Sequence, residues 1–185
     1  MEGKKKLVIK PFKSKPKVPE NFELNTWNKL KDAVIAVDRR VAVSTNKEEL
    51  YQAVEDLCRQ KSGPDVYEKL SILCQGLIES RINELVGQST LDHGSYLQLV
   101  ERLWNHHCDI MLTIRNIFLY LDRSYALNAA NTKSNGIIIL PICDMGNHYF
   151  KLCLAAKKDI EERIIHALLA AIELDRQMNS PKQMY

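Results

Sequence analysis

Apolar residues recur every three or four positions along most of the chain after Pro19, which is the spacing of amphipathic helices. The first such segment starts near residue 26, where Thr26 can act as the N-cap. Its apolar positions are Trp27, Leu30, Val34, Val37 and Val41. The spacing predicts a first helix that begins at about Thr26.

Two further helices follow closely. Thr45 or Asn46 stands three residues before Glu48 or Glu49, which is the pattern of a capping box and predicts a helix over about 46–60. A third helix begins at Ser62-Gly63-Pro64, because proline in the first turn loses no hydrogen bond. Its apolar positions are Tyr67, Leu70, Leu73, Cys74, Leu77, Ile78, Ile82 and Leu85.

A longer apolar rhythm runs from Asp92 to about Leu127, without proline and, after Gly94, without glycine. Either one very long helix or two helices joined by a kink near residues 106–109 would satisfy it. Residues 128–136 have the composition of a loop. We count Ile137–Leu140 as buried loop, because this single β-like run has no predicted partner strand. Two more helices are expected in 140–156 and 157–177, so the predicted fold is all-α.

The positive charge is concentrated at the amino terminus. Seven lysines against Glu2 give residues 1–19 a formal charge of +6, so the remaining 166 residues carry −3 of the total of +3. The folded part is therefore not expected to bind nucleic acid directly. Within this basic segment stand four apolar residues that a partner's groove could order: Leu7, Val8, Ile9 and Phe12.

The pattern of reactive residues favours a protein that is not an enzyme. The chain has no GxSxG, no phosphate-cradling glycine loop and no HExxH, and we expect no cofactor. Neighbouring side chains of the run His106-His107-Cys108-Asp109 diverge on a helix, so we expect no metal site there. Five cysteines without a CxxC pair or a signal peptide indicate a reducing, intracellular compartment. The longest apolar runs are too short to cross a membrane.

Five segments of the chain resemble the cullin family, and most closely its cullin-4 group. They are KKLVIKPF (5–12), NTWNKLKDAVIAV (25–37), EELYQAVEDLC (48–58), CDIMLTIRNIFLYLDRSYAL (108–127) and DMGNHYF (144–150). Cullins are scaffolds of RING-type ubiquitin ligases. The resemblance implies a cullin-repeat-like bundle of five helices over 23–127, behind an extended basic arm, 1–22. A loop (128–140), two helices of a partial second repeat (141–178) and a tail (179–185) would follow.

The resemblance also implies a function and a partner. In this family the arm and the second and fifth helices dock a β-propeller substrate adaptor, the DNA-damage-binding adaptor, in the nucleus and cytoplasm. Carried onto this sequence, the adaptor-binding residues are Leu7, Val8, Ile9, Phe12, Leu50, Tyr51, Val54, His107, Met111, Ile114, Arg115 and Phe118. The residues from His107 to Phe118 lie at offsets of 4, 7, 8 and 11, so they share one stripe of a helix. Leu50, Val54 and Ile114 are the ones most expected to be structural.

The chain departs from the family pattern in three places. Cys143 stands where cullins have tryptophan, and the preceding loop is expanded by TKSNGIII (132–139). Cullins also continue into a domain that holds the RING subunit, so we expect this chain to hold the adaptor without binding that subunit or being ligase-competent. Two alternatives remain: a helical module that associates with itself, and an enzyme or nucleic-acid binder that uses the lysine arm.

Overall fold

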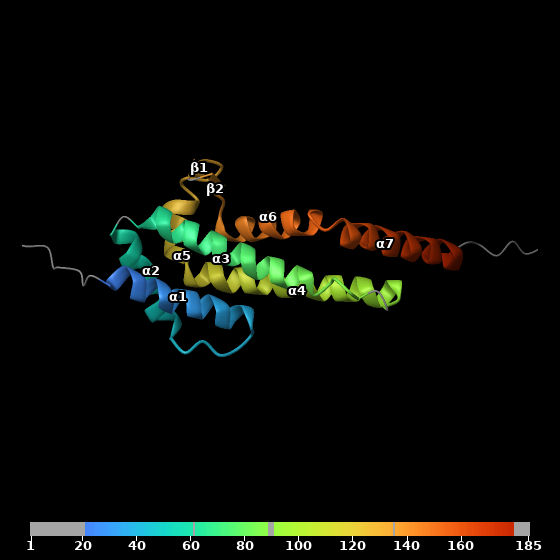
Figure 1. Ribbon diagram of the computed structural model, residues 1–185, viewed down its shortest axis with the longest axis horizontal. Helices are drawn as coiled ribbons and strands as arrows, with labels where there is room; N and C mark the ends of the chain where they lie inside the picture. The colour runs from blue at the N-terminus through green and yellow to red at the C-terminus, as the bar shows by residue number, and fades with distance from the viewer. Residues whose placement is uncertain (1–20, 61, 89–90, 135, 180–185) are drawn as a thin grey trace, which may run out of the picture.

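The computed structural model describes residues 21–60, 62–88, 91–134 and 136–179 as an elongated stack of helices (Figure 1). The all-α prediction is confirmed, with one very small sheet in addition. The helices are α1 Phe22–Asp38, α2 Lys47–Arg59, α3 Gly63–Asn83, α4 His93–Ile117, α5 Leu119–Leu121, the π-helix η1 Asp122–Ala126, α6 Ile142–Ala155 and α7 Lys158–Asn179. The strands are β1 Lys133–Ser134 and β2 Ile137–Ile138.

Helix starts follow local chemistry, with one exception. The Asn46 side chain accepts a hydrogen bond from the Glu49 amide at 2.7 Å, so the predicted cap of α2 is confirmed. Pro64 lies in the first turn of α3, as predicted. The prediction that Thr26 caps the first helix is wrong, because α1 already begins at Phe22 after Asn21.

The helical segment predicted from Asp92 to about Leu127 breaks at Phe118, and not near residues 106–109. α4 runs without interruption through residues 106–109 and ends at Ile117. Phe118 then leaves helical geometry, with φ −93° and ψ 23°, and a short α5 leads into η1. The amide of Leu127 bonds to the Asp122 carbonyl, the five-residue spacing of a π-helix. The alternative of two helices joined by a kink near residues 106–109 is therefore wrong.

The loop before α6 contains a two-residue antiparallel hairpin. Lys133 pairs with Ile138 and Ser134 with Ile137, so the view that Ile137–Leu140 has no partner strand is wrong. Beyond the hairpin, the Tyr67 hydroxyl donates to the Leu140 carbonyl and accepts from its amide, both at 2.8 Å. Burial raises the pKa of Tyr67 to about 12, so this two-way link stays protonated. The loop is thereby fixed to α3.

The core lies between the helices along the long axis of the molecule. α6 packs against both α3 and α4, α7 against α4, and α2 against α5. α6 therefore shares the core of the helices that precede it, and the predicted boundary between two repeats at residue 141 stays a prediction. The largest fully buried side chains are Tyr67, Tyr96, Phe118, Leu30, Leu50, Leu57, Leu70, Ile78, Ile82, Leu85, Met111 and Ile114.

α4 and α6 approach each other closely at Gly146. A Cβ atom at this position would lie 2.6–2.8 Å from three atoms of the Met111 side chain. Changing Gly146 to alanine is expected to lower the free energy of unfolding by about 1–2 kcal/mol, because overpacking outweighs the gain in helix propensity. Denaturant unfolding measures this change.

Gly76 provides the matched control. It lies exposed on α3, and a Cβ atom added at this position would have no atom within 4 Å. The same glycine-to-alanine change there should stabilise the protein by about 0.5–1 kcal/mol through helix propensity alone. Equal effects at the two positions would contradict the close packing of α6 on Met111.

Candidate protein-docking surface

The surface formed by α2 with the end of α4 contains a groove. The groove has a volume of about 410 Å³. Its walls come from the end of α1, the segment before α2, the start of α2 and the last turns of α4. They carry Val37, Val43, Thr45, Asn46, Lys47, Leu50, Thr113, Asn116 and Ile117. Four of these side chains are apolar and five are polar, and a groove that combines the two kinds can receive an amphipathic side chain of a partner.

Two tyrosines extend this surface onto α5. Tyr51 on α2 is 36% exposed, and its ring meets that of half-buried Tyr120 edge to face at 6.3 Å. Tyr51 lies at the surface because α2 is amphipathic. The core-facing residues of this helix are Leu50, Val54 and Leu57. Of the predicted adaptor-binding residues, Tyr51 is the one that the structure places most clearly at the surface.

The predicted stripe on α4 does exist, but it faces α6. His107, Met111, Ile114 and Phe118 are each at most 2% exposed, so they are core residues in this structure. Met111 packs on Gly146 and the His107 ring lies 4.8 Å from that of Phe150 on α6. A partner that docks on this conformation cannot contact them. Their assignment as contact residues has no support from this conformation and stays a prediction from the resemblance.

Leu50 and Val54 on α2 are also buried, as the sequence analysis expected for structural positions. Leu50 nonetheless contributes to the floor of the groove, whereas Val54 does not line it. The remaining predicted residues, Leu7, Val8, Ile9 and Phe12, lie outside the described residues.

His107 occupies a buried polar site between helices. Its Nδ1 atom lies 3.4 Å from Nη1 of Arg81, and Arg81 forms an ion pair with Asp38 at 3.1 Å. Burial, helped by the positive charge of Arg81, lowers the pKa of His107 to about 4. The ring is therefore neutral near pH 7. This chain of contacts ties the end of α1 to α3 and α4, which is a structural role.

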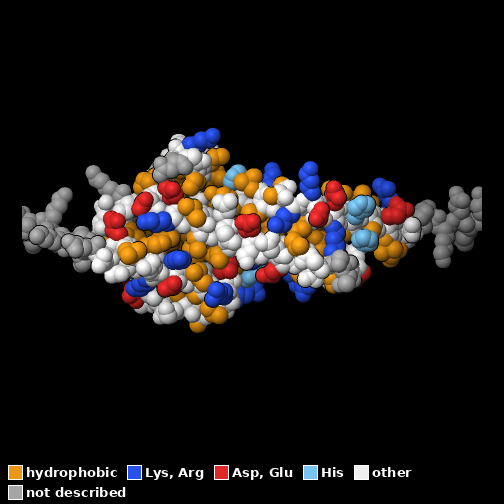
Figure 2. Space-filling view, in the orientation of Figure 1, with side chains coloured by type: hydrophobic (Ala, Val, Ile, Leu, Met, Phe, Trp, Pro, Cys, Tyr) orange, Lys and Arg blue, Asp and Glu red, His pale blue; other side chains and the backbone are white. Residues whose placement is uncertain are grey.

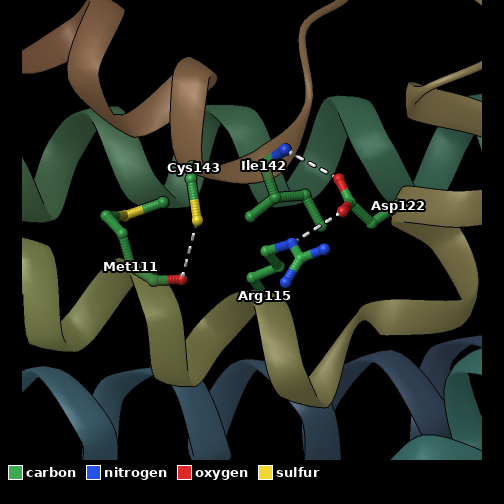
Figure 3. A network of polar contacts seen from close by, with 5 residues as sticks. All are labelled: Met111, Arg115, Asp122, Ile142 and Cys143. Carbon is green, nitrogen blue, oxygen red and sulfur yellow. Dashed lines mark hydrogen bonds and ion pairs between the residues drawn. The ribbon is translucent and has the colours of Figure 1, made fainter.

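Asp122 organises a second polar network, shown in Figure 3. Its Oδ2 atom accepts a hydrogen bond from Arg115 Nε at 2.9 Å, and its Oδ1 atom accepts one from the Ile142 amide at 2.8 Å. The carboxylate thus meets the positive end of α6, a favourable position for a negative charge. Arg115 is half-buried, with its side chain 35% exposed, and is partly committed to this internal contact. Beside it, Cys143 Sγ points to the Met111 carbonyl at 4.0 Å.

The reactive side chains give little support for catalysis. Burial raises the pKa of Cys58 to about 11 and that of Cys74 to about 12, the opposite of what a nucleophilic thiolate needs. Within the described residues, no cluster of three or more His, Cys, Asp or Glu side chains could hold a metal ion. None of the helices that the structure describes is long and apolar enough to cross a membrane.

Sequence reasoning missed most residues of the groove. Val43, Thr113 and Asn116 were not singled out, because each depends on how α2 is placed against α4. One signal was available for Asn116. It follows the predicted stripe residue Arg115 directly and is polar, as expected for a position turned away from a buried face.

The fold is a stack of helices with a groove between α2 and the end of α4, which is the architecture of a helical solenoid protein. Residues 27–184 match the family description "Cullin alpha solenoid domain". The chain belongs to the cullin family, whose members are scaffolds of cullin–RING ubiquitin ligases.

The similar proteins include several cullins. The chain is 37% identical to Cullin-4A of Homo sapiens over 94% of its own length, and 36% identical to Cullin-4 of Dictyostelium discoideum over 95%. Cullin-3 of Caenorhabditis elegans is 29% identical over 96% of the chain. In each case the chain spans only about a fifth of the relative's length, 22%, 21% and 21% respectively. The higher identities agree with the cullin-4 resemblance seen in the sequence.

Proposed function

We propose that this chain docks a β-propeller substrate adaptor, the DNA-damage-binding adaptor, through its basic arm and the α2–α5 surface. One observation supports this most directly. Phe22, the first residue of α1, lines a small cleft together with Gln52, Ala53 and Asp56 of α2. The arm therefore joins the folded part directly beside α2. A single partner can contact the arm and the docking surface at the same time.

The proposed contact set follows from burial. On the folded part it consists of exposed Tyr51, half-buried Tyr120, the accessible edge of the groove at Lys47 and Asn116, and the exposed portion of Arg115. On the arm it remains Leu7, Val8, Ile9 and Phe12. A few aromatic and aliphatic anchors usually dominate such interfaces. The lysines of the arm would add electrostatic steering.

Changing Tyr51 to alanine is expected to weaken adaptor binding by about 2 kcal/mol, roughly thirtyfold, because it removes an exposed aromatic anchor from this surface. Removing residues 1–13 is expected to weaken it at least as much. Co-purification with the adaptor, followed by calorimetry, measures both effects.

The matched control is Leu174, which is exposed on α7, the helix at the opposite end of the molecule from α2 (Figure 1). Its change to alanine should leave adaptor binding unaltered. If the intact chain does not co-purify with the adaptor, or if binding ignores both the arm and Tyr51, the proposed function is wrong.

A second candidate function rests on the exposed face of α7. Ile165, Leu168, Leu169 and Ile172 on this helix are each about half exposed, and Figure 2 shows hydrophobic side chains interspersed with charged ones at this end of the molecule. Such a face can pair with a second copy of the chain. Light scattering over a range of concentrations tests this, since a strictly monomeric species would exclude self-association.

A further inference from the structure

A second concave site lies where α6 passes into α7, toward the end of the molecule opposite α2 (Figure 1). The cleft has a volume of about 710 Å³, within the range of pockets that hold small ligands. The turn after α3, the first part of α4 and the junction of α6 with α7 form its walls. It is lined by Leu85, Val86, Gly87, Tyr96, Ala156, Lys157, Lys158, Asp159, Ile160 and Arg163.

The charged part of this lining is mainly positive. Lys157, Lys158 and Arg163 face a single carboxylate, Asp159, within the cleft. Neither lysine has an ion pair with another residue that the structure describes. This local excess of positive charge contrasts with the net negative charge of the chain after residue 19. An anion would therefore find complementary charge here.

The backbone adds to the positive potential. α7 is 22 residues long and begins at Lys158, and the amides of Ile160 and Glu161 already bond to the Lys157 carbonyl. The amides that remain for a ligand are those of the cleft residues Lys158 and Asp159. The positive end of the helix dipole lies at the same place. Helix starts of this kind bind phosphate groups when further donors converge on them.

Tyr96 supplies an independent observation at this cleft. The residue lines the cleft from α4 and is 1% exposed, yet its hydroxyl has no hydrogen-bond partner among the described residues. Buried hydroxyls are normally hydrogen-bonded, so one without an acceptor needs an explanation. The guanidinium carbon of Arg163 lies 4.0 Å from the centre of the Tyr96 ring. Its Nη2 atom donates a hydrogen bond to the Leu91 carbonyl at 3.1 Å. Its other donors are available to an anion beside the tyrosine.

We propose that this cleft binds a phosphate monoester carried on an apolar body, in the form of a phosphorylated side chain of a partner peptide. Lys157, Lys158, Arg163 and the first amides of α7 hold the phosphate oxygens. The Tyr96 hydroxyl donates to one of them. Leu85, Val86 and Ile160 contact the apolar part of the ligand.

The composition of the cleft favours a phosphopeptide over nucleic acid. Nucleic acid requires a basic track that follows several phosphates, whereas here three cations surround one confined cleft. Exposed Glu161 and Glu162 follow directly on α7 and would repel a polyanion. A single phosphate can pair with the three cations, while the apolar group that carries it packs on Leu85, Val86 and Ile160.

The test uses the 185-residue chain with phenyl phosphate as the probe and inorganic phosphate for comparison. Saturable shifts of the backbone amide resonances of Gly87, Lys158 and Asp159 are expected. Phenyl phosphate should bind several times more tightly than inorganic phosphate. Absence of saturable shifts at these amides, or equal affinity for the two probes, would overturn the proposal.

Variants separate specific binding from general attraction to lysines. Changing both Lys157 and Lys158 to glutamine should weaken phenyl phosphate binding by about tenfold or more, since two charge-assisted contacts are lost. Lys151→Gln, on the exposed face of α6, should leave it unchanged. Equal losses in the two variants would contradict a defined site.

Tyr96→Phe tests the hydroxyl without disturbing the core. Because this hydroxyl has no partner among the described residues, the melting temperature should not fall, while phenyl phosphate affinity should drop several-fold. Lower stability with unchanged affinity would show that Tyr96 has only a structural role and would overturn its place in the site. The outcome is independent of adaptor docking, which is measured at α2.

Discussion

Replacement of Asp122 by alanine is expected to lower the free energy of unfolding by about 3 kcal/mol, the largest effect of any single substitution considered for this protein. The carboxylate is 1% exposed and is shared by Arg115 and the Ile142 amide. Without it, the buried amide at the start of α6 has no acceptor and Arg115 loses its partner. Urea unfolding of the two proteins measures the difference.

Asp144 is the matched control for this experiment. It lies in the first turn of the same helix but is exposed, so its change to alanine removes the same charge near the same helix end. The expected cost is within about 0.5 kcal/mol. A comparable loss at both positions would mean that general electrostatics at the start of α6, and not the buried network, stabilises the protein.

Acidification is expected to destabilise the protein through His107. The pKa of this histidine is about 4 in the folded chain and 6.5 as its ordinary value, so the unfolded state takes up the proton first. Stability from this group is therefore unchanged above about pH 6.5, falls as the pH drops toward 4, and is constant below that. This difference between the two pKa values corresponds to at most about 3 kcal/mol in the free energy of unfolding.

Comparison with His107→Phe isolates this contribution, because phenylalanine keeps the ring packing against Trp104 and Phe150 but cannot bind the proton. The variant should lose less stability than the natural protein between pH 6.5 and 4. His166→Gln, exposed on α7, should keep the natural pH dependence. Parallel pH profiles for the natural protein and His107→Phe would refute the role of His107.

Much of the helical fold could be predicted from the sequence. Apolar spacing and capping residues are local signals, and they located α2, α3 and the start of α4 to within a few residues. The break at Phe118 and the π-helix after it were not predictable in this way. No proline or glycine marks them; the network that Asp122 forms with Arg115 and Ile142 accompanies them.

The candidate site could be predicted only in part. The stripe from His107 to Phe118 was found correctly as a stripe, yet periodicity is the same for a helix face that meets the core and for one that meets a partner. The packing of α6 determines that this face is buried, because Gly146 allows the α6 backbone to lie directly on the Met111 side chain. The residues left accessible nearby, Tyr51 and the edge of the groove, follow from that packing.

The sequence by itself determined the helical class, most helix starts, the basic arm and the cullin resemblance, since each rests on residue types at short range. Only the tertiary structure decided which faces are buried, because burial depends on contacts between helices far apart in the chain. The cleft between α4 and α7 shows this most clearly. Tyr96 and Lys158 are 62 positions apart, and only the packing of α7 on α4 brings them to the same site.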